Sequence, residues 1–191
     1  GPVDLYGFFG GEHEKNDPIL GRAIRDASNV LLPVVFQFEH EFKSPASESL
    51  TESAFFSVKN HERFNEYNPI TANGVLMPVP ALIKEAMGLG FINMFPDADG
   101  TLRWEAMVIG YKGQLYPSIT LKTAMTYLGI PQEKVVLDAT KGIQVGKMYI
   151  PTDRWGRTFT NYYAPEQTFK HISISDILDD KAVDFLSSLC E

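Results

Sequence analysis

The sequence lacks the features that reveal a protein's chemistry most directly: paired cysteines, closely spaced histidines and a long apolar run. Its one cysteine, Cys190, stands next to the last residue, so no intrachain disulfide can form. No histidine stands three or four residues from another, which excludes a helical pair of metal ligands. A run of about 18 apolar residues, the length of a membrane helix, is also absent. We therefore expect no metal centre, no cofactor and no membrane span within these residues.

Positive charge is scarce as well. The 17 lysine and arginine residues are outnumbered by 24 aspartate and glutamate residues, which gives a net charge of −7. Domains that bind nucleic acids usually carry a basic patch, and anionic lipid headgroups attract the same feature. We therefore expect no nucleic-acid partner.

What the chain does have is 191 residues with 44% hydrophobic and 12% aromatic side chains, enough to bury a sizeable core.

Sequence motifs of catalysis are missing too. The chain has neither the G-x-S-x-G elbow of hydrolases nor the G-x-x-x-x-G-K-[ST] loop of nucleotide-binding proteins. Cys190 lies too close to the chain end to favour a catalytic nucleophile. Residues 97–100 (DADG) resemble the start of a calcium loop, but the third acidic position and the distal glutamate are absent, so we interpret them as a turn. The chain is predicted not to be an enzyme.

Apolar residues at helical spacing, bounded by capping residues, predict four helices. The first begins at Asp17-Pro18, the second covers Pro80–Met87, the third runs from Pro117 to a stop at Gly129, and the last covers Lys181–Leu189. A helical turn is predicted at Ser175–Leu178. The apolar faces expected for the first and third helices consist of Leu20, Ala23, Ile24 and Ala27, and of Leu121, Ala124, Met125 and Leu128.

Strands are predicted where β-branched and aromatic residues cluster between turn formers. Their ranges are Val30–Phe38, Ala54–Val58, Leu89–Phe95, Thr101–Tyr111, Val135–Leu137, Ile143–Ile150, Arg157–Tyr163 and Phe169–Ile172. Asp99-Gly100 predicts a hairpin between the third and fourth of these, and Asp153–Gly156 predicts a turn between the sixth and seventh. Pro33 predicts a bulge or an edge position in the first strand. The order of elements predicts an α/β or α+β fold, with a mixed central sheet flanked by helices and hairpins in the C-terminal half.

One stretch differs in character from the rest. Residues 39–75 are polar and rich in turn formers, and we interpret them as a long excursion from the domain body or an insertion. Residues 1–191, this stretch included, are predicted to form a single domain.

Arg103 follows Gly100 by three residues and has two interpretations. In the structural one, which we favour, its guanidinium pairs with Asp97 or Asp99 and clamps the turn, because an arginine fork fits a local carboxylate. In the functional one, it contacts a carboxylate or phosphate of a ligand. Aromatic side chains beside a fixed cation suit small polar ligands. The candidate ligand-binding residues are accordingly Arg103, Trp155, Tyr162 and Tyr163.

Four blocks of residues carry a family resemblance. They are Asp17-Pro18-Ile19-Leu20 through Ala23-Ile24 with Asn29-Val30-Leu31-Leu32; Gly90-Phe91 with Asp97-Ala98-Asp99-Gly100-Thr101-Leu102-Arg103; Tyr116-Pro117-Ser118-Ile119 with Leu121; and Ile150-Pro151-Thr152-Asp153 with Gly156, Asn161-Tyr162, Thr168-Phe169, Ile172-Ser173 and Asp176-Ile177-Leu178. In this order and spacing they resemble the type-2 CHASE domain (cyclase/histidine-kinase-associated sensory extracellular domain). The motif residues expected to hold the fold are Asp97, Asp99, Gly100, Arg103, Pro117, Asp153, Gly156 and Asn161.

The chain departs from the family pattern in two places. Trp104 stands where members often have a second arginine, and residues 161–165 (NYYAP) stand where they often have N-Y-R-G-P. A ligand contact through that Arg-Gly pair is therefore not expected here.

The resemblance implies a sensor on the periplasmic or extracellular side of the cell membrane, trimmed at both ends from a bacterial receptor with membrane helices. It also implies a cytoplasmic output module outside this chain: an adenylate or guanylate cyclase, the histidine kinase of a two-component system, or a Ser/Thr kinase. The stimulus would be a small molecule or a protein, and a homodimer would fit the usual two-fold symmetry of such receptors.

Two other hypotheses stay open at this point. One is a soluble α/β hydrolase or other small-molecule enzyme, which would show a convergent pocket with perturbed pKa values. The other is a protein-interaction module that uses residues 39–75.

Overall fold

The computed structural model describes residues 16–39, 50–55, 57–59, 67–163, 173 and 175–176. By its contacts the chain divides into two compact units, residues 1–160 and 161–191, and the helices and strands named below belong to the first. Two predicted elements (Phe169–Ile172 and Lys181–Leu189), Cys190 and all four histidines lie outside the described residues. None of the helices within those ranges is long and apolar enough to cross a bilayer.

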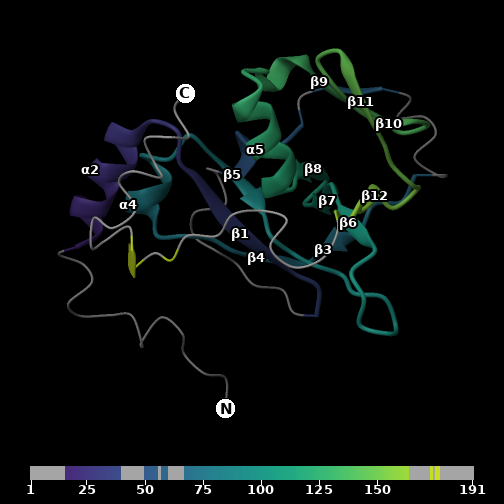
Figure 1. Cartoon of the computed structure of the whole chain (residues 1–191), viewed down its shortest axis with the longest axis horizontal. Coiled ribbons are helices and arrows are strands. Elements are labelled where there is room, and N and C mark those ends of the chain that lie inside the picture. Colours follow the sequence, from purple (N-terminus) through teal and green to yellow (C-terminus); the bar gives the residue numbers. More distant parts are fainter. Residues whose placement is uncertain are drawn as a thin grey trace. The chain divides into compact units, whose positions relative to one another are not determined.

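Strand β1 (Leu31–Gln37) is the centre of a mixed sheet with the order β4-β1-β5 (Figure 1). It runs parallel to β5 (Gly88–Phe91) and antiparallel to β4 (Gly74–Leu76). The β4 ladder covers only residues 35–37 of β1, so Pro33 lies beyond it, at the kind of edge position that its missing N–H predicts.

A second mixed sheet has the order β3-β7-β8. Strands β7 (Val108–Tyr111) and β8 (Gln114–Pro117) form a hairpin, and β3 (Thr71–Ala72) lies parallel to β7. Every residue of β7 is buried. Because side chains alternate along a strand, Val108 packs into one hydrophobic core while Ile109 packs into the other.

The first core joins this sheet to β1 and β5 around Phe36. The ring of Phe36 lies 5.9 Å from that of Phe91 and 5.6 Å from those of both Tyr111 and Tyr116. The edge-on and tilted ring geometries are those that the aromatic quadrupole favours.

The second core lies under a four-stranded sheet with the order β11-β10-β9-β2. Its strands are β2 (Ser57–Lys59), β9 (Val135–Asp138), β10 (Gly142–Val145) and β11 (Met148–Pro151), and only the β2–β9 pair is parallel. Leu121 and Met125 of helix α5 (Ile119–Tyr127) belong to this core.

Helix α5 begins at a different residue from the one predicted. Pro117 ends β8, and Ser118 caps the helix by accepting a hydrogen bond from the Leu121 N–H at 3.1 Å. The helix packs against β5 and β1 (Figure 1). Its predicted apolar stripe is wrong at Leu128, which is exposed, while Lys122 is buried.

Helix α2 (Asp17–Ala27) forms where predicted but buries a different face. Leu20, Ala23 and Ala27 are exposed, and only Gly21 and Ile24 are buried. The reason is its contact with α4 (Pro80–Ile83), because a Cβ at Gly21 would already stand 3.4 Å from the Ala81 carbonyl oxygen. Helix α4 is shorter than the predicted Pro80–Met87.

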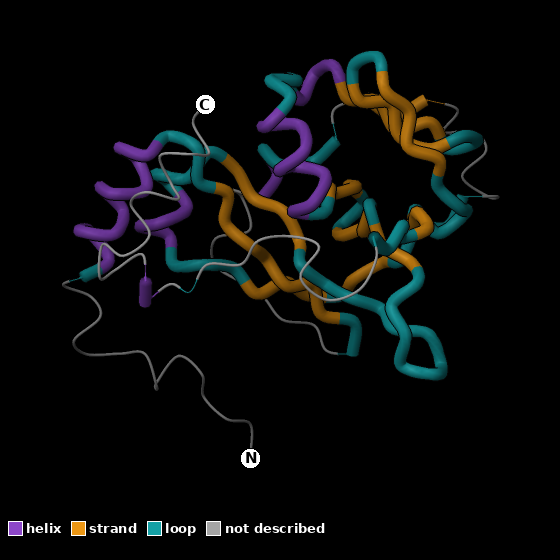
Figure 2. The backbone as a smooth tube through the Cα atoms, in the orientation of Figure 1, coloured by secondary structure: helices purple, strands orange, loops and turns teal. Residues whose placement is uncertain are grey.

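The predicted hairpin across Asp99-Gly100 is wrong. Strand β5 ends at Phe91 and pairs with β1, and residues 92–103 form a loop (Figure 2). After that loop, β6 (Trp104–Ala106) pairs with β12 (Arg157–Phe159). The amide of Asn93 exchanges two 2.8 Å hydrogen bonds with the backbone of Phe36, so a side chain continues the β1 ladder where a strand would have been needed.

Several strand boundaries also differ from prediction. Ile143–Ile150 is two strands, because Gly146 with a φ of +60° turns the chain between β10 and β11. Arg157–Tyr163 is a strand only to Phe159. The α/β class with mixed pairing and C-terminal hairpins is confirmed, although the pairing is distributed over several sheets.

The described parts of residues 39–75 contribute to the core. Leu50, Ala54, Tyr67, Ala72 and Val75 are all buried. These positions therefore belong to the body of the fold and not to an excursion from it.

Candidate functional site

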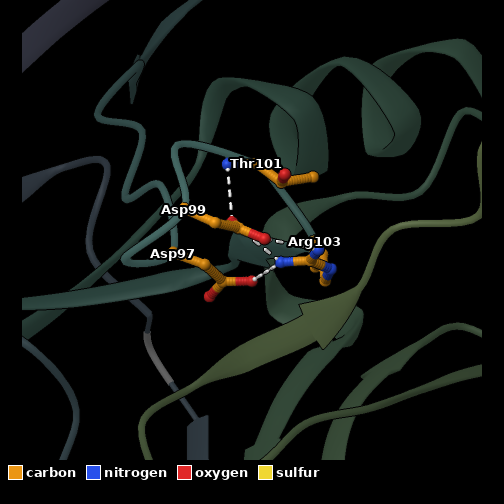
Figure 3. Close-up of polar contacts among 4 residues, drawn as sticks. All are labelled: Asp97, Asp99, Thr101 and Arg103. Carbon is orange, nitrogen blue, oxygen red and sulfur yellow. Dashed lines mark hydrogen bonds and ion pairs between the residues drawn. The ribbon is translucent and has the colours of Figure 1, made fainter.

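Arg103 closes the loop of residues 92–103 by bonding to both acids of the motif (Figure 3). One guanidinium nitrogen lies 2.9 Å from an oxygen of Asp97 and 3.0 Å from one of Asp99, and the other lies 2.8 Å from Asp99. The Thr101 N–H also donates to Asp99. Gly100 takes a φ of +80°, which the turn requires. The guanidinium of Arg103, a candidate ligand contact in the sequence, thus bonds to acids of its own turn.

These contacts shift the titration of the cluster. Hydrogen bonds from Arg103 first, and from the Thr101 N–H second, lower the pKa of Asp99 from 3.8 to about 2. The same carboxylates raise the pKa of Arg103. Because the pKa of Asp99 is depressed, its stabilising effect is complete above its ordinary pKa and is lost as pH falls through about 2. The site is solvent-exposed, so this effect on stability is small.

We expect Arg103→Gln to raise the pKa of Asp99 part of the way back toward 3.8, because the Thr101 N–H stays in place. Carboxylate chemical shifts measured by NMR against pH would report it. Arg25→Gln, an exposed change on α2, should leave the titration of Asp99 alone. Identical Asp99 titrations in wild type and Arg103→Gln would contradict the assigned clamp.

Trp155 lies in a second turn, which is held by Asp153. Both carboxylate oxygens of Asp153 are used: one accepts the N–H groups of Trp155 and Arg157, and the other accepts Arg157 Nε and Nη2 at 2.9 and 2.8 Å. The Arg157 guanidinium lies 4.7 Å from the centre of the Trp155 ring and 5.0 Å from that of Trp104. Phe159 meets Trp104 edge-on at 5.2 Å. The guanidinium therefore lies close to two indole rings.

The candidate residues Arg103 and Trp155, which both lie in the first unit, have different partners. Arg103 bonds to Asp97 and Asp99 in the loop before β6, whereas Trp155 lies against the guanidinium of Arg157, which also lies near the Trp104 ring. Tyr162 and Tyr163 are 65% and 68% exposed and belong, with Asn161, to the second unit of the chain. Their role as ligand contacts stays a prediction.

Sequence reasoning missed two residues that the structure makes prominent. Arg157 was included only as part of a strand, yet Asp153 four residues earlier was a usable signal for a turn-closing ion pair. Lys122 was not singled out, although it directly follows Leu121 and stands three residues before Met125, in the middle of the buried face of α5. In the described part of the chain, no group of three histidine, cysteine or acidic side chains could hold a metal ion.

Comparison with known proteins identifies a family. The model of the CHASE2 domain family matches residues 3–188, which is nearly the whole chain and includes all four blocks. No curated protein and no solved structure matches the chain.

Proposed function

The chain belongs to the CHASE2 domain family, as the four blocks of its sequence predicted, and on this premise we propose that it is the stimulus-binding part of a bacterial transmembrane receptor. The family consists of sensory domains that lie outside the cytoplasm. A match over residues 3–188 is the observation that carries the proposal, because it covers the fold and not a single motif. The proposed place is the periplasmic or extracellular face of the cell membrane.

We further propose that the receptor's output lies in the cytoplasm and outside this chain, as a nucleotide cyclase, a histidine kinase or a Ser/Thr kinase. The chain itself would bind and not catalyse. A stimulus then acts only through different affinities for two states of the receptor. A homodimer is the simplest assembly that could carry such a change, because a two-fold axis relates two identical sensors.

The geometry of the motif residues supports a scaffold role for them. Asp97, Asp99 and Arg103 bond to one another, and Asp153 bonds to Arg157 and two backbone N–H groups. These groups fix turns at the ends of strands. The motif is therefore better suited to hold the fold than to perform chemistry on a substrate.

A metabolite screen on the 191-residue chain tests binding against catalysis. A sensor ligand should raise the melting temperature in proportion to RT ln(1 + [L]/Kd), and mass spectrometry should recover that ligand unchanged after prolonged incubation. Steady conversion of any binder into product by the purified chain would contradict a non-catalytic sensor. Hydrolysis would favour the enzyme alternative directly.

A further inference from the structure

Lys122 lies on the buried face of α5, although lysine is among the residues least often buried without an ionic partner. The residue is only 7% exposed, and its neighbours on that face, Leu121 and Met125, are core residues. Desolvation lowers the pKa of the Lys122 ammonium. A cation in this position carries a free-energy cost that a counter-ion would offset.

The one partner that the described residues give Lys122 is neutral. Its Nζ donates to the side-chain oxygen of Gln132, and the Gln132 amide nitrogen donates to the carbonyl oxygens of Ala54 and Glu52. None of the described carboxylates forms an ion pair with Lys122. Two of the three ammonium hydrogens are thus left for another acceptor.

Two adjoining hollows share Lys122, Gln132 and Met87 in their walls. One, of about 370 Å³, has a largely apolar lining that includes Leu31, Met125 and Ile130. The other, of about 360 Å³, is lined more by polar groups, among them Ser53, Lys84 and Glu52. Lys122 therefore lies where an apolar recess adjoins a polar one.

The charges around these hollows favour a ligand with a single negative charge. Lys122 and Lys84 supply two positive charges, and Glu52 supplies one negative charge. A dianion such as phosphate would meet more repulsion from Glu52 than a monocarboxylate would. An apolar body would match the recess beside Met87 and Met125.

We propose that Lys122 and Gln132 form the binding site for a small monocarboxylic acid, with the carboxylate on Lys122 and an apolar chain in the recess of Leu31, Met87, Met125 and Ile130. The site stands on this geometry alone. Its use as the stimulus site of a receptor rests on the proposed function. Ligand binding would supply the counter-ion that the described fold does not give Lys122.

Isothermal titration of the 191-residue chain with hexanoate at neutral pH tests the site. We expect saturable one-to-one binding, at least about tenfold weaker binding of hexanamide, which has the same shape without the charge, and weaker binding of inorganic phosphate. Lys122→Met should weaken hexanoate binding about tenfold or more and should melt no lower than wild type, because it removes a buried charge. Lys134→Met, an exposed change two residues after Gln132, should bind like wild type.

Three results would overturn the site: no hexanoate binding to the wild-type chain, equal binding by Lys122→Met, or equal affinity for hexanoate and hexanamide. NMR of the Lys122 side chain gives a readout that needs no variant. Hexanoate should raise the pKa of Lys122. The affinity for hexanoate should fall as pH rises through the pKa that Lys122 has in the ligand-free chain. An unchanged Lys122 titration in saturating hexanoate would equally exclude the site.

The two proposals fail separately. A different metabolite that binds wild type and Lys122→Met alike would remove the Lys122 site and leave the sensor intact. Hexanoate bound at Lys122, in a chain that protease digestion of intact spheroplasts shows to lie in the cytoplasm, would keep the site and contradict the proposed receptor.

Discussion

Replacing Gly90 by alanine is expected to lower the free energy of unfolding by about 3 kcal/mol, the upper part of the range for overpacked cores. A Cβ at this position would stand 2.5 Å from Ile119 Cα and 2.7 Å from Ile119 N. Those atoms are backbone at the start of α5, so a side-chain rotation cannot relieve the clash. The helix would have to move away from β5, against which it packs. Urea unfolding followed by circular dichroism would measure the change.

Gly88→Ala is the matched control in the same strand. Its Cβ would meet only a methyl group of Leu31 at 3.5 Å, an ordinary contact, so we expect a change within about 0.5 kcal/mol. If Gly88→Ala and Gly90→Ala lower the free energy of unfolding equally, the close approach of β5 and α5 is not the reason for glycine in the Gly90-Phe91 motif.

Asp153→Ala is expected to lower the free energy of unfolding by about 2–3 kcal/mol, because it leaves two backbone N–H groups and a guanidinium without their acceptor. The carboxylate accepts four hydrogen bonds, and the side chains of Asp153 and Arg157 are only 20% and 23% exposed. The fluorescence of Trp155 should shift as the turn loosens, since Arg157 would no longer be held against its ring. Thermal unfolding and tryptophan emission would record both effects.

Asp97→Ala provides the comparison for this turn. Asp97 contributes one oxygen to Arg103, which keeps both of its bonds to Asp99, so a loss below about 1 kcal/mol is expected for an exposed pair. A larger loss at Asp97 than at Asp153 would contradict the view that the second turn is the stronger of the two.

Local features of this fold could be predicted from the sequence. The turn of residues 97–100, its arginine clamp and the stop of α5 at Gly129 depend on residues a few positions apart, and turn chemistry acts over that distance. Gly90, in the second block, and Asn93, three residues later, depend instead on residues that are distant in sequence: Gly90 lies against Ile119, and Asn93 bonds to the backbone of Phe36.

Strand pairing could not be predicted in the same way. Asp99-Gly100 favours a hairpin locally, yet β5 pairs with β1 and β6 pairs with β12, more than 50 residues away along the chain. Burial of Leu89 and Phe91 in the first core outweighs the turn signal, because core burial contributes more than one turn does. A local sequence pattern cannot show whether burial in a distant core will outweigh a turn preference.

Lys122 shows the same limit at the candidate site. A lysine beside a leucine in an amphipathic helix is normally assigned to the solvated side. The buried Lys122 donates to Gln132, which lies in the 3-10 turn η3 (Gln132–Lys134) and bonds to the backbone carbonyls of Glu52 and Ala54. The partner is ten residues away in a separate element, so the site becomes visible only in the folded chain.

The most direct test of the central claim is the membrane topology of the complete protein as its gene encodes it. Intact spheroplasts would be treated with trypsin from outside, and an antibody against residues 67–163 would follow the chain, with a cytoplasmic enzyme as the marker of integrity. An extracytoplasmic sensory domain predicts loss of the chain in intact spheroplasts while the marker survives. A chain that resists trypsin until the membrane is lysed would contradict the account.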